Sequence, residues 1–119
     1  MSYNIKVTPA LVSKVAQVDI NNVPMGIAFT DHMFICEYEN GAWVNPRIEP
    51  LEMIPTHPAA MALHYGQAIF EGLKATMGKN NTPLLFRPDE NAKRMNVSAY
   101  RMGMPNFPED LFVEGLKQL

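Results

Sequence analysis

The sequence of 119 residues has one cysteine and lacks any long apolar run. A single cysteine, Cys36, excludes an internal disulfide and is typical of a reducing compartment. No apolar stretch reaches the roughly 20 residues that a membrane-spanning helix needs. The N-terminus has no apolar core followed by a cleavage site, which argues against a secretory signal. These absences predict a cytoplasmic globular protein.

Charge is also scarce. Ten Lys and Arg against 12 Asp and Glu give a net charge of −2, and charged residues make up 18% of the chain. A dedicated nucleic-acid binder is usually basic overall, so this class is disfavoured. A hydrophobic fraction of 47% is ordinary for a globular protein, and the length fits one domain. We predict a single domain over residues 1–119 with an α+β fold, a mostly antiparallel sheet carrying two or three packed helices.

The motifs of metal and nucleotide chemistry are missing as well. The histidines His32, His57 and His64 have no Cys, His or carboxylate at the spacings that metal sites use. No nucleophile elbow, phosphate-binding P-loop or GxGxxG pattern occurs. We therefore predict no metal ligands.

The first half of the chain favours strands. The valine-rich segment Leu11–Ile20 predicts a strand or an extended arm, and Ile27–Phe29 opens a β-rich region. The Asn40-Gly41 pair predicts a hairpin from about Met33 to Val44, because both residues tolerate positive φ. Four prolines within residues 46–60 predict an extended connector.

The second half favours helices around a second hairpin. A helix is predicted from Ala59 to Glu71, ended by Gly72 in the left-handed conformation. Strands at Leu73–Thr76 and Leu84–Arg87 follow, joined by a polar turn. Proline and acidic residues then predict helices that begin at Pro88 and Pro108. The helix from Pro88 carries an apolar stripe: Ala92, Met95, Ala99 and Met102.

The region from Leu63 to Met104 contains six of the ten Lys and Arg residues and is the best candidate for binding an anion. Arg94 and Arg101 share a helical face away from the apolar stripe. An arginine held there can bind a phosphate or carboxylate with two hydrogen bonds. The alternative is a solvated basic face, which we favour for Arg101, while both interpretations stay open for Arg94.

Two aromatic residues lie near glycines in the same region. Tyr65 and Phe70 can belong to the core, the usual place of such side chains, or can line a pocket that Gly66 and Gly72 let a ligand approach closely. Residue type alone favours the core.

Four runs resemble branched-chain amino acid aminotransferases, which are fold-type IV enzymes that use pyridoxal 5′-phosphate (PLP). They are FTDHMF from Phe29, LHYGQAIFEGLKA from Leu63, LFRPDENAKRM from Leu85 and SAYRMGMP from Ser98. The resemblance implies that this chain is the smaller, N-terminal domain of a two-domain, homodimeric transaminase of amino-acid metabolism. Such an enzyme exchanges the amino group of Leu, Ile or Val with 2-oxoglutarate.

The resemblance also implies roles for particular residues. Arg94 matches the arginine that binds the cofactor phosphate. Tyr65, Phe70 and Gly72 match positions of the substrate pocket, and Tyr65 resembles a residue supplied across the dimer interface. Lys74 stands where a basic residue is usual. The Schiff-base lysine of the family lies in the other domain, so no catalytic residue is expected here and the chain alone should be inactive.

One position departs from the family, and two rival interpretations remain. Met25 stands where many relatives have a phenylalanine of the pocket, which leaves the side-chain preference open. Another fold-type IV enzyme, a D-amino acid transaminase or an aminodeoxychorismate lyase, would share the fold, but the runs from Leu63 and Leu85 look much less like those enzymes. A non-catalytic anion-binding module that uses Arg94 is the rival of a different class.

Overall fold

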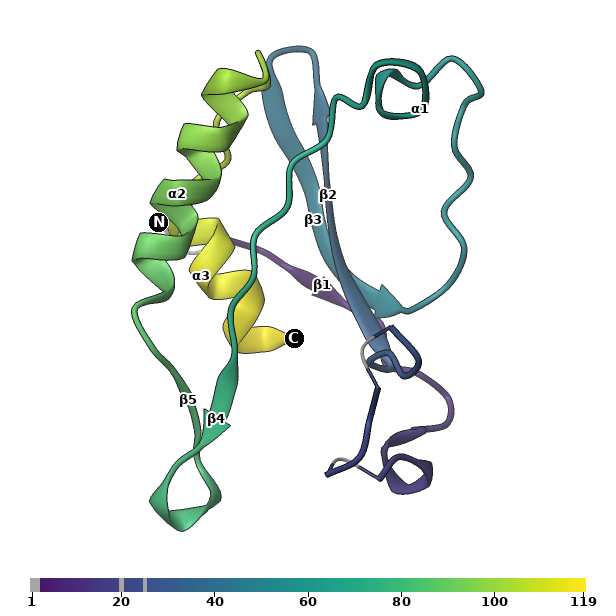
Figure 1. The fold of residues 1–119 in the computed structure, drawn as a ribbon, viewed down its shortest axis with the longest axis vertical. Helices are drawn as coiled ribbons and strands as arrows, with labels where there is room; N and C mark the ends of the chain where they lie inside the picture. The colour runs from purple at the N-terminus through teal and green to yellow at the C-terminus, as the bar shows by residue number, and fades with distance from the viewer. Residues whose placement is uncertain (1–2, 20, 25) are drawn as a thin grey trace. The chain divides into compact units, whose positions relative to one another are not determined.

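The computed structural model describes residues 3–19, 21–24 and 26–119. The chain divides into two compact units, one of residues 1–54 with 115–119 and one of residues 55–114. Helices and two small sheets make up the described part, and two of its three strand pairings are antiparallel (Figure 1). This confirms the predicted α+β class.

The first unit is built on a three-stranded sheet in the order β1-β3-β2. Strand β1 (Lys6–Val7) pairs in parallel with β3 (Ala42–Pro50), which pairs antiparallel with β2 (His32–Glu39). Ile48 lies on the central strand and is 2% exposed. The predicted hairpin is confirmed: Asn40 and Gly41 have φ of 50° and 85°, as the tight turn between twisted strands requires.

Strand β3 is longer than the sequence suggested. Residues 46–50, expected in the connector, continue the strand despite its prolines. A bulge makes this possible. Ile35 pairs with Arg47 and Glu37 pairs with Val44, so two β3 residues, Asn45 and Pro46, stand opposite one residue of β2. Asn45 takes φ of 52°, and Pro46 lies where no ladder hydrogen bond is needed from it.

The segment Leu11–Ile20, predicted as a strand or an extended arm, forms no strand in its described part. The described part of this segment is irregular and contains one short 3-10 turn, η1 (Val15–Gln17), and Leu11 is fully exposed. Ile20 lies outside the described residues. A valine-rich segment forms a strand only where a neighbouring strand pairs with it, and none of the described strands pairs with this segment. Ile27–Phe29 likewise forms a turn and a loop instead of a strand.

The N-terminal arm, residues 8–19, is tethered by two residues where β2 begins, Asp31 and His32. The Asp31 carboxylate accepts hydrogen bonds from the Ser13 hydroxyl (2.6 Å) and the Lys14 amide (2.9 Å). These bonds lower the pKa of Asp31, with the Ser13 hydroxyl as the larger cause. The Nε2 atom of His32 accepts from the Ala10 amide at 2.8 Å. Part of the FTDHMF run therefore has a structural role.

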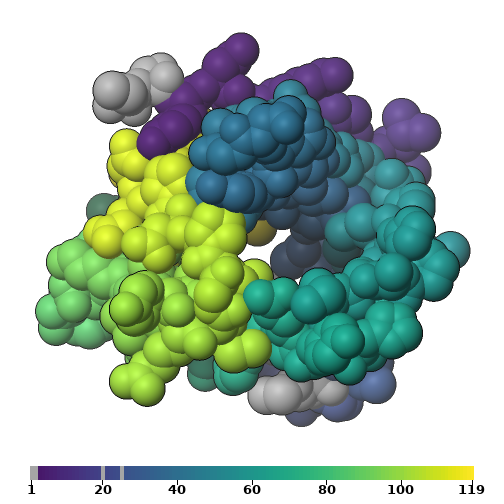
Figure 2. All heavy atoms as spheres, turned by 90° about the horizontal axis from the view of Figure 1, so that it is seen from above, coloured from purple at the N-terminus to yellow at the C-terminus, as the bar shows by residue number. Residues whose placement is uncertain are grey.

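The second unit begins with a helix much shorter than predicted. Helix α1 spans Met61–Tyr65, whereas the prediction was Ala59–Glu71. Gly66, with φ of 62° and ψ of 26°, ends the helix in the left-handed conformation that was assigned to Gly72. The chain then runs on as an extended trace to β4 (Figure 1). In the space-filling view, teal atoms from this part of the chain lie at the surface (Figure 2).

The remaining elements follow the prediction with small changes of boundary. Strands β4 (Ala75–Met77) and β5 (Pro83–Leu85) form the second hairpin, closed by the 3-10 turn η2 (Lys79–Asn81). Helix α2 spans Pro88–Arg101 and helix α3 spans Glu109–Gln118. None of the helices in the described part is long and apolar enough to cross a bilayer.

Helix α2 is well defined at both ends. Pro88 begins it, and acidic residues occupy its first turn. At its end, the Met104 amide donates to the Ala99 carbonyl (2.9 Å) and the Gly103 amide donates to the Tyr100 carbonyl (3.2 Å), the hydrogen-bond pattern of a Schellman motif. Of the predicted stripe, Ala92 and Ala99 are buried, while Met95 is half-buried and Met102 is partly exposed.

The turn at Gly41 provides a first prediction. The substitution Gly41→Ala should lower the free energy of unfolding by about 1 kcal/mol, because an L side chain is strained at positive φ. A Cβ at Gly41 would meet no atom within 4 Å, so steric overlap adds nothing to this cost. Urea denaturation of the purified protein measures the change. Gly72→Ala is the matched control, because Gly72 also has open space and lacks a positive φ; equal losses in both variants would contradict the prediction.

Candidate cofactor and substrate site

The segment between α1 and β4 alternates in exposure. Along residues 67–74, the residues of odd number are half-buried and those of even number are exposed. A period of two is the signature of an extended chain, whose side chains point to opposite sides in turn. The exposed face contains Phe70, Gly72 and Lys74, which are three of the four predicted substrate-binding residues.

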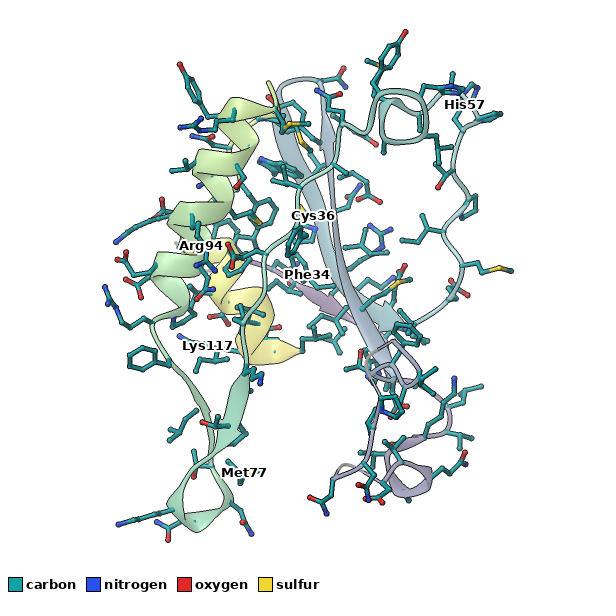
Figure 3. The ribbon with its side chains drawn as sticks, in the orientation of Figure 1. Phe34, Cys36, His57, Met77, Arg94 and Lys117 are labelled. Atoms are coloured by element: carbon teal, nitrogen blue, oxygen red, sulfur yellow. The ribbon has the colours of Figure 1, made fainter. Side chains whose placement is uncertain are left out.

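Helix α2 places Arg94 against the half-buried face of this segment (Figure 3). The Arg94 Nε donates to Oε2 of Glu71 at 2.9 Å, and Nη2 donates to Oε1 of the same carboxylate. The pair is therefore a bidentate arginine–carboxylate contact. It is also uneven, because the side chain of Glu71 is 7% exposed while that of Arg94 is 67% exposed. The shielded carboxylate of Glu71 thus holds one edge of the guanidinium of the accessible Arg94.

The carboxylate of Glu71 collects further donors. Its Oε1 accepts from the Gly72 amide at 3.0 Å and from the Asn91 side-chain amide at 3.0 Å. Hydrogen bonding from Arg94, followed by that from Asn91, lowers the pKa of Glu71 from 4.5 to about 2, although desolvation by burial acts in the opposite direction. The group is consequently ionised at any ordinary pH.

Asn91 and Gln67 complete the attachment of the segment to α2. Asn91 lies one turn before Arg94, so both side chains leave the same face of the helix. Its Nδ2 also donates to the Gly72 carbonyl at 3.1 Å. Gln67 donates from Nε2 to the Met102 carbonyl at 2.8 Å, at the other end of α2. The extended segment is thereby held at two points along one helix.

The geometry of Arg94 fits a phosphate group. A guanidinium has two edges that can form forked contacts, one made by Nε with Nη2 and one made by the two Nη atoms. Glu71 binds the first edge, and the exposed position of Arg94 leaves the second accessible to an anion. An arginine held in this way is suited to bind the phosphate of PLP.

The two aromatic residues are both at the surface. Tyr65, the last residue of α1, is 77% exposed, and Phe70 is 92% exposed. The core placement that residue type favoured is therefore wrong for both. Arg101 is exposed on α2, in agreement with its interpretation as part of a solvated face. Met25 lies outside the described residues.

Glu71 and Asn91 are two residues of this arrangement that were not predicted from the sequence. The signal was present, since Glu71 is a carboxylate inside an otherwise apolar alternation from Ile69 to Leu73. The prediction of a helix across this segment hid the alternation. Asn91 gave no signal, because an asparagine near a helix N-terminus is common.

Metal ligands and cavities are two further features of the described residues that bear on a site. No group of three or more His, Cys, Asp or Glu side chains among them could hold a metal ion. In the first unit, a cavity of about 370 Å³ is bordered by the N-terminal arm and the start of β2, including Val15, Phe29 and His32. It contains none of the predicted site residues.

Comparison with known proteins relates the chain to one group of enzymes. No family model matches it. It is 44% identical over 108 residues to branched-chain-amino-acid aminotransferase 2 of Bacillus subtilis, a match that covers 90% of this chain and 30% of the relative. Branched-chain-amino-acid transaminase 1 of the same organism is 47% identical over 102 residues, with coverage of 85% and 29%. The cytosolic mouse aminotransferase is 42% identical over 114 residues, with coverage of 95% and 29%.

These relatives define the class as aminotransferases. The chain is similar, as a partial segment, to branched-chain-amino-acid aminotransferases, which confirms the resemblance found in the sequence. It spans about 30% of the length of these relatives.

The Glu71–Arg94 pair predicts a dependence of stability on pH. Because the pKa of Glu71 is lowered to about 2, its ionised form stabilises the fold fully above 4.5, and this stabilisation is lost as the pH falls from 4.5 towards 2. At neutral pH, Glu71→Gln should lower the free energy of unfolding by about 1–2 kcal/mol, since the exposure of Arg94 weakens the pair. The difference in free energy of unfolding between Glu71→Gln and the unmodified protein should become smaller as the pH falls from 4.5 towards 2.

Urea denaturation at a series of pH values measures this effect. Glu90→Gln is the matched control, because it removes the same charge from an exposed ion pair with Lys93 and should change stability little. A difference between Glu71→Gln and the unmodified protein that stays constant down to the acid limit would be incompatible with the lowered pKa.

Proposed function

We propose that the full-length protein is a PLP-dependent branched-chain amino acid aminotransferase. It would exchange the amino group of Leu, Ile or Val with 2-oxoglutarate. The observation that carries the proposal is the identity of 42–47% over 85–95% of the chain to enzymes named for this activity. The accessible and rigidly held Arg94 supports it independently, because its second edge suits a phosphate.

In this proposal the chain is the small, N-terminal domain and supplies half of the active site. Arg94 binds the cofactor phosphate. Phe70, Gly72 and Lys74, which share the exposed face of the extended segment, form one wall of the substrate pocket together with Tyr65. Exposed aromatic rings suit the branched aliphatic side chains of the substrates, and the backbone at Gly72 allows close approach. When bound, PLP supplies the electron sink for removal of the proton at the substrate α-carbon.

The remaining parts of the site would come from elsewhere. The Schiff-base lysine belongs to a second domain of the same protein, and a second copy of the protein completes a homodimer in which Tyr65 contributes across the interface. The exposure of Tyr65 in the isolated chain is in keeping with such a role. We place the enzyme in the cytoplasm, since the single cysteine of these 119 residues suits a reducing compartment.

The role of Arg94 can be tested in the full-length protein. Arg94→Ala should weaken the binding of PLP at least tenfold, because a charge-assisted bidentate contact with the phosphate is lost. Spectroscopic titration with PLP measures the dissociation constant. Arg101→Ala is the matched control, an exposed arginine of the same helix outside the site. Unchanged affinity in Arg94→Ala would remove Arg94 from the phosphate site.

The division of the active site gives a second test. The purified chain of 119 residues should show no transamination of leucine with 2-oxoglutarate in the presence of PLP, because the Schiff-base lysine is supplied by the second domain. A coupled assay for glutamate formation measures the turnover, with the full-length protein as the positive control. Turnover by the chain alone would overturn this assignment.

A further inference from the structure

Glu71 contacts both the helix of Arg94 and the backbone of the extended segment between α1 and β4. Its carboxylate binds Arg94 through two guanidinium nitrogens and the amide of Gly72 through Oε1. It lies on the half-buried face of the segment, opposite Phe70 and Lys74, and therefore does not belong to the exposed wall itself.

The contact with Arg94 restricts the guanidinium to one orientation. A long side chain that is two-thirds exposed would otherwise sample many rotamers, and each binding event would have to overcome that freedom. Two parallel N–H···O contacts to a fixed carboxylate define both the position and the plane of the group. The second edge of Arg94 is thus oriented before any anion arrives.

The contact with Gly72 restricts the substrate-binding segment. Glu71 accepts from the Gly72 amide, and Asn91, which is bound to the same carboxylate oxygen, donates to the Gly72 carbonyl at 3.1 Å. Both polar groups of this glycine are therefore held by the Glu71–Asn91 pair. A glycine with free rotation would leave the neighbouring Phe70 and Lys74 poorly placed.

We propose that Glu71 is a positioning residue that fixes the phosphate-binding arginine and the substrate wall relative to each other. The proposal rests on the proposed function, since it takes Arg94 as the phosphate ligand and Phe70 with Gly72 as part of the substrate pocket. Asn91 assists on the side of the substrate wall, because it donates to the Gly72 carbonyl as well as to Glu71, whereas Arg94 makes its two contacts with Glu71 directly.

Loss of Glu71 and loss of Asn91 should change different properties, the preference for the phosphorylated cofactor and the KM for leucine, whereas a general loss of stability would change neither selectively. Loss of the Glu71 charge should reduce the preference for PLP over pyridoxal, which lacks the phosphate, because Arg94 is no longer oriented. Weaker folding alone would lower the affinity for both compounds alike and leave their ratio unchanged. Loss of the Asn91 side chain should instead raise the KM for leucine and leave the PLP-to-pyridoxal ratio near its original value.

The experiment uses the full-length protein and the variants Glu71→Gln, Asn91→Ala and Arg94→Ala, with Glu90→Gln as the control for removal of an exposed charge. Dissociation constants for PLP and pyridoxal come from spectroscopic titration. The preference is the dissociation constant for pyridoxal divided by that for PLP, and in Glu71→Gln this ratio should fall on the order of tenfold. In the double variant Glu71→Gln with Arg94→Ala the ratio should fall no further than in Arg94→Ala alone, because both changes remove the same contact.

The outcomes distinguish the two proposals. If Arg94→Ala lowers the ratio and Glu71→Gln does not, the positioning role of Glu71 is overturned and the phosphate role of Arg94 stands. If Arg94→Ala leaves the ratio unchanged, the phosphate role itself fails. If Glu71→Gln does not fold, Asn91→Ala still decides the substrate side, where an unchanged KM for leucine would overturn the coupling.

Discussion

The second unit depends on one carboxylate, that of Glu71, whose side chain is largely shielded from water. Glu71 is taken almost completely out of water, which would be costly for an isolated charge. Donors from Arg94, Asn91 and the Gly72 backbone compensate for the lost hydration. All of these donors belong to α2 or to the extended segment, so the shielded carboxylate keeps its hydrogen bonds only when the two lie against each other. The requirement to neutralise Glu71 therefore specifies how this segment docks on its helix.

The parts of the fold that the sequence predicted correctly are those with a strong local signal. Asn40-Gly41 defines a hairpin through its φ preferences, and Pro88 defines the start of α2 through its ring. The failures lie where a local signal competes with its surroundings. Residues 66–71 have good helix formers, yet Gly66 ends α1 and the burial of Glu71 favours an extended chain. The valines before Ile20 have strand propensity but no partner strand.

The candidate site was predicted in its exposed residues and missed in its supporting ones. Arg94 could be proposed because a surface arginine at a fixed helical position suggests an anion, and the family resemblance then favoured a phosphate. Phe70 and Tyr65 depended on the resemblance alone, since residue type favoured the core. Glu71 was hidden by the prediction of a helix, and Asn91 could not be found without the structure. The importance of both comes from hydrogen bonds across 20 and 23 residues of sequence.

The bulge at Asn45 and Pro46 also affects the register in which strand β1 pairs with β3. Strand β1 contributes only two residues to the sheet, pairing Lys6 with Arg47 and Val7 with Ile48. So short a parallel ladder has little of its own to define the alignment. A slip by one residue towards the β2–β3 turn would bring Pro46, which has no amide hydrogen, opposite Lys6, and would turn the alternating side chains to the wrong faces. The proline thus serves as a stop that sets the register of the first strand.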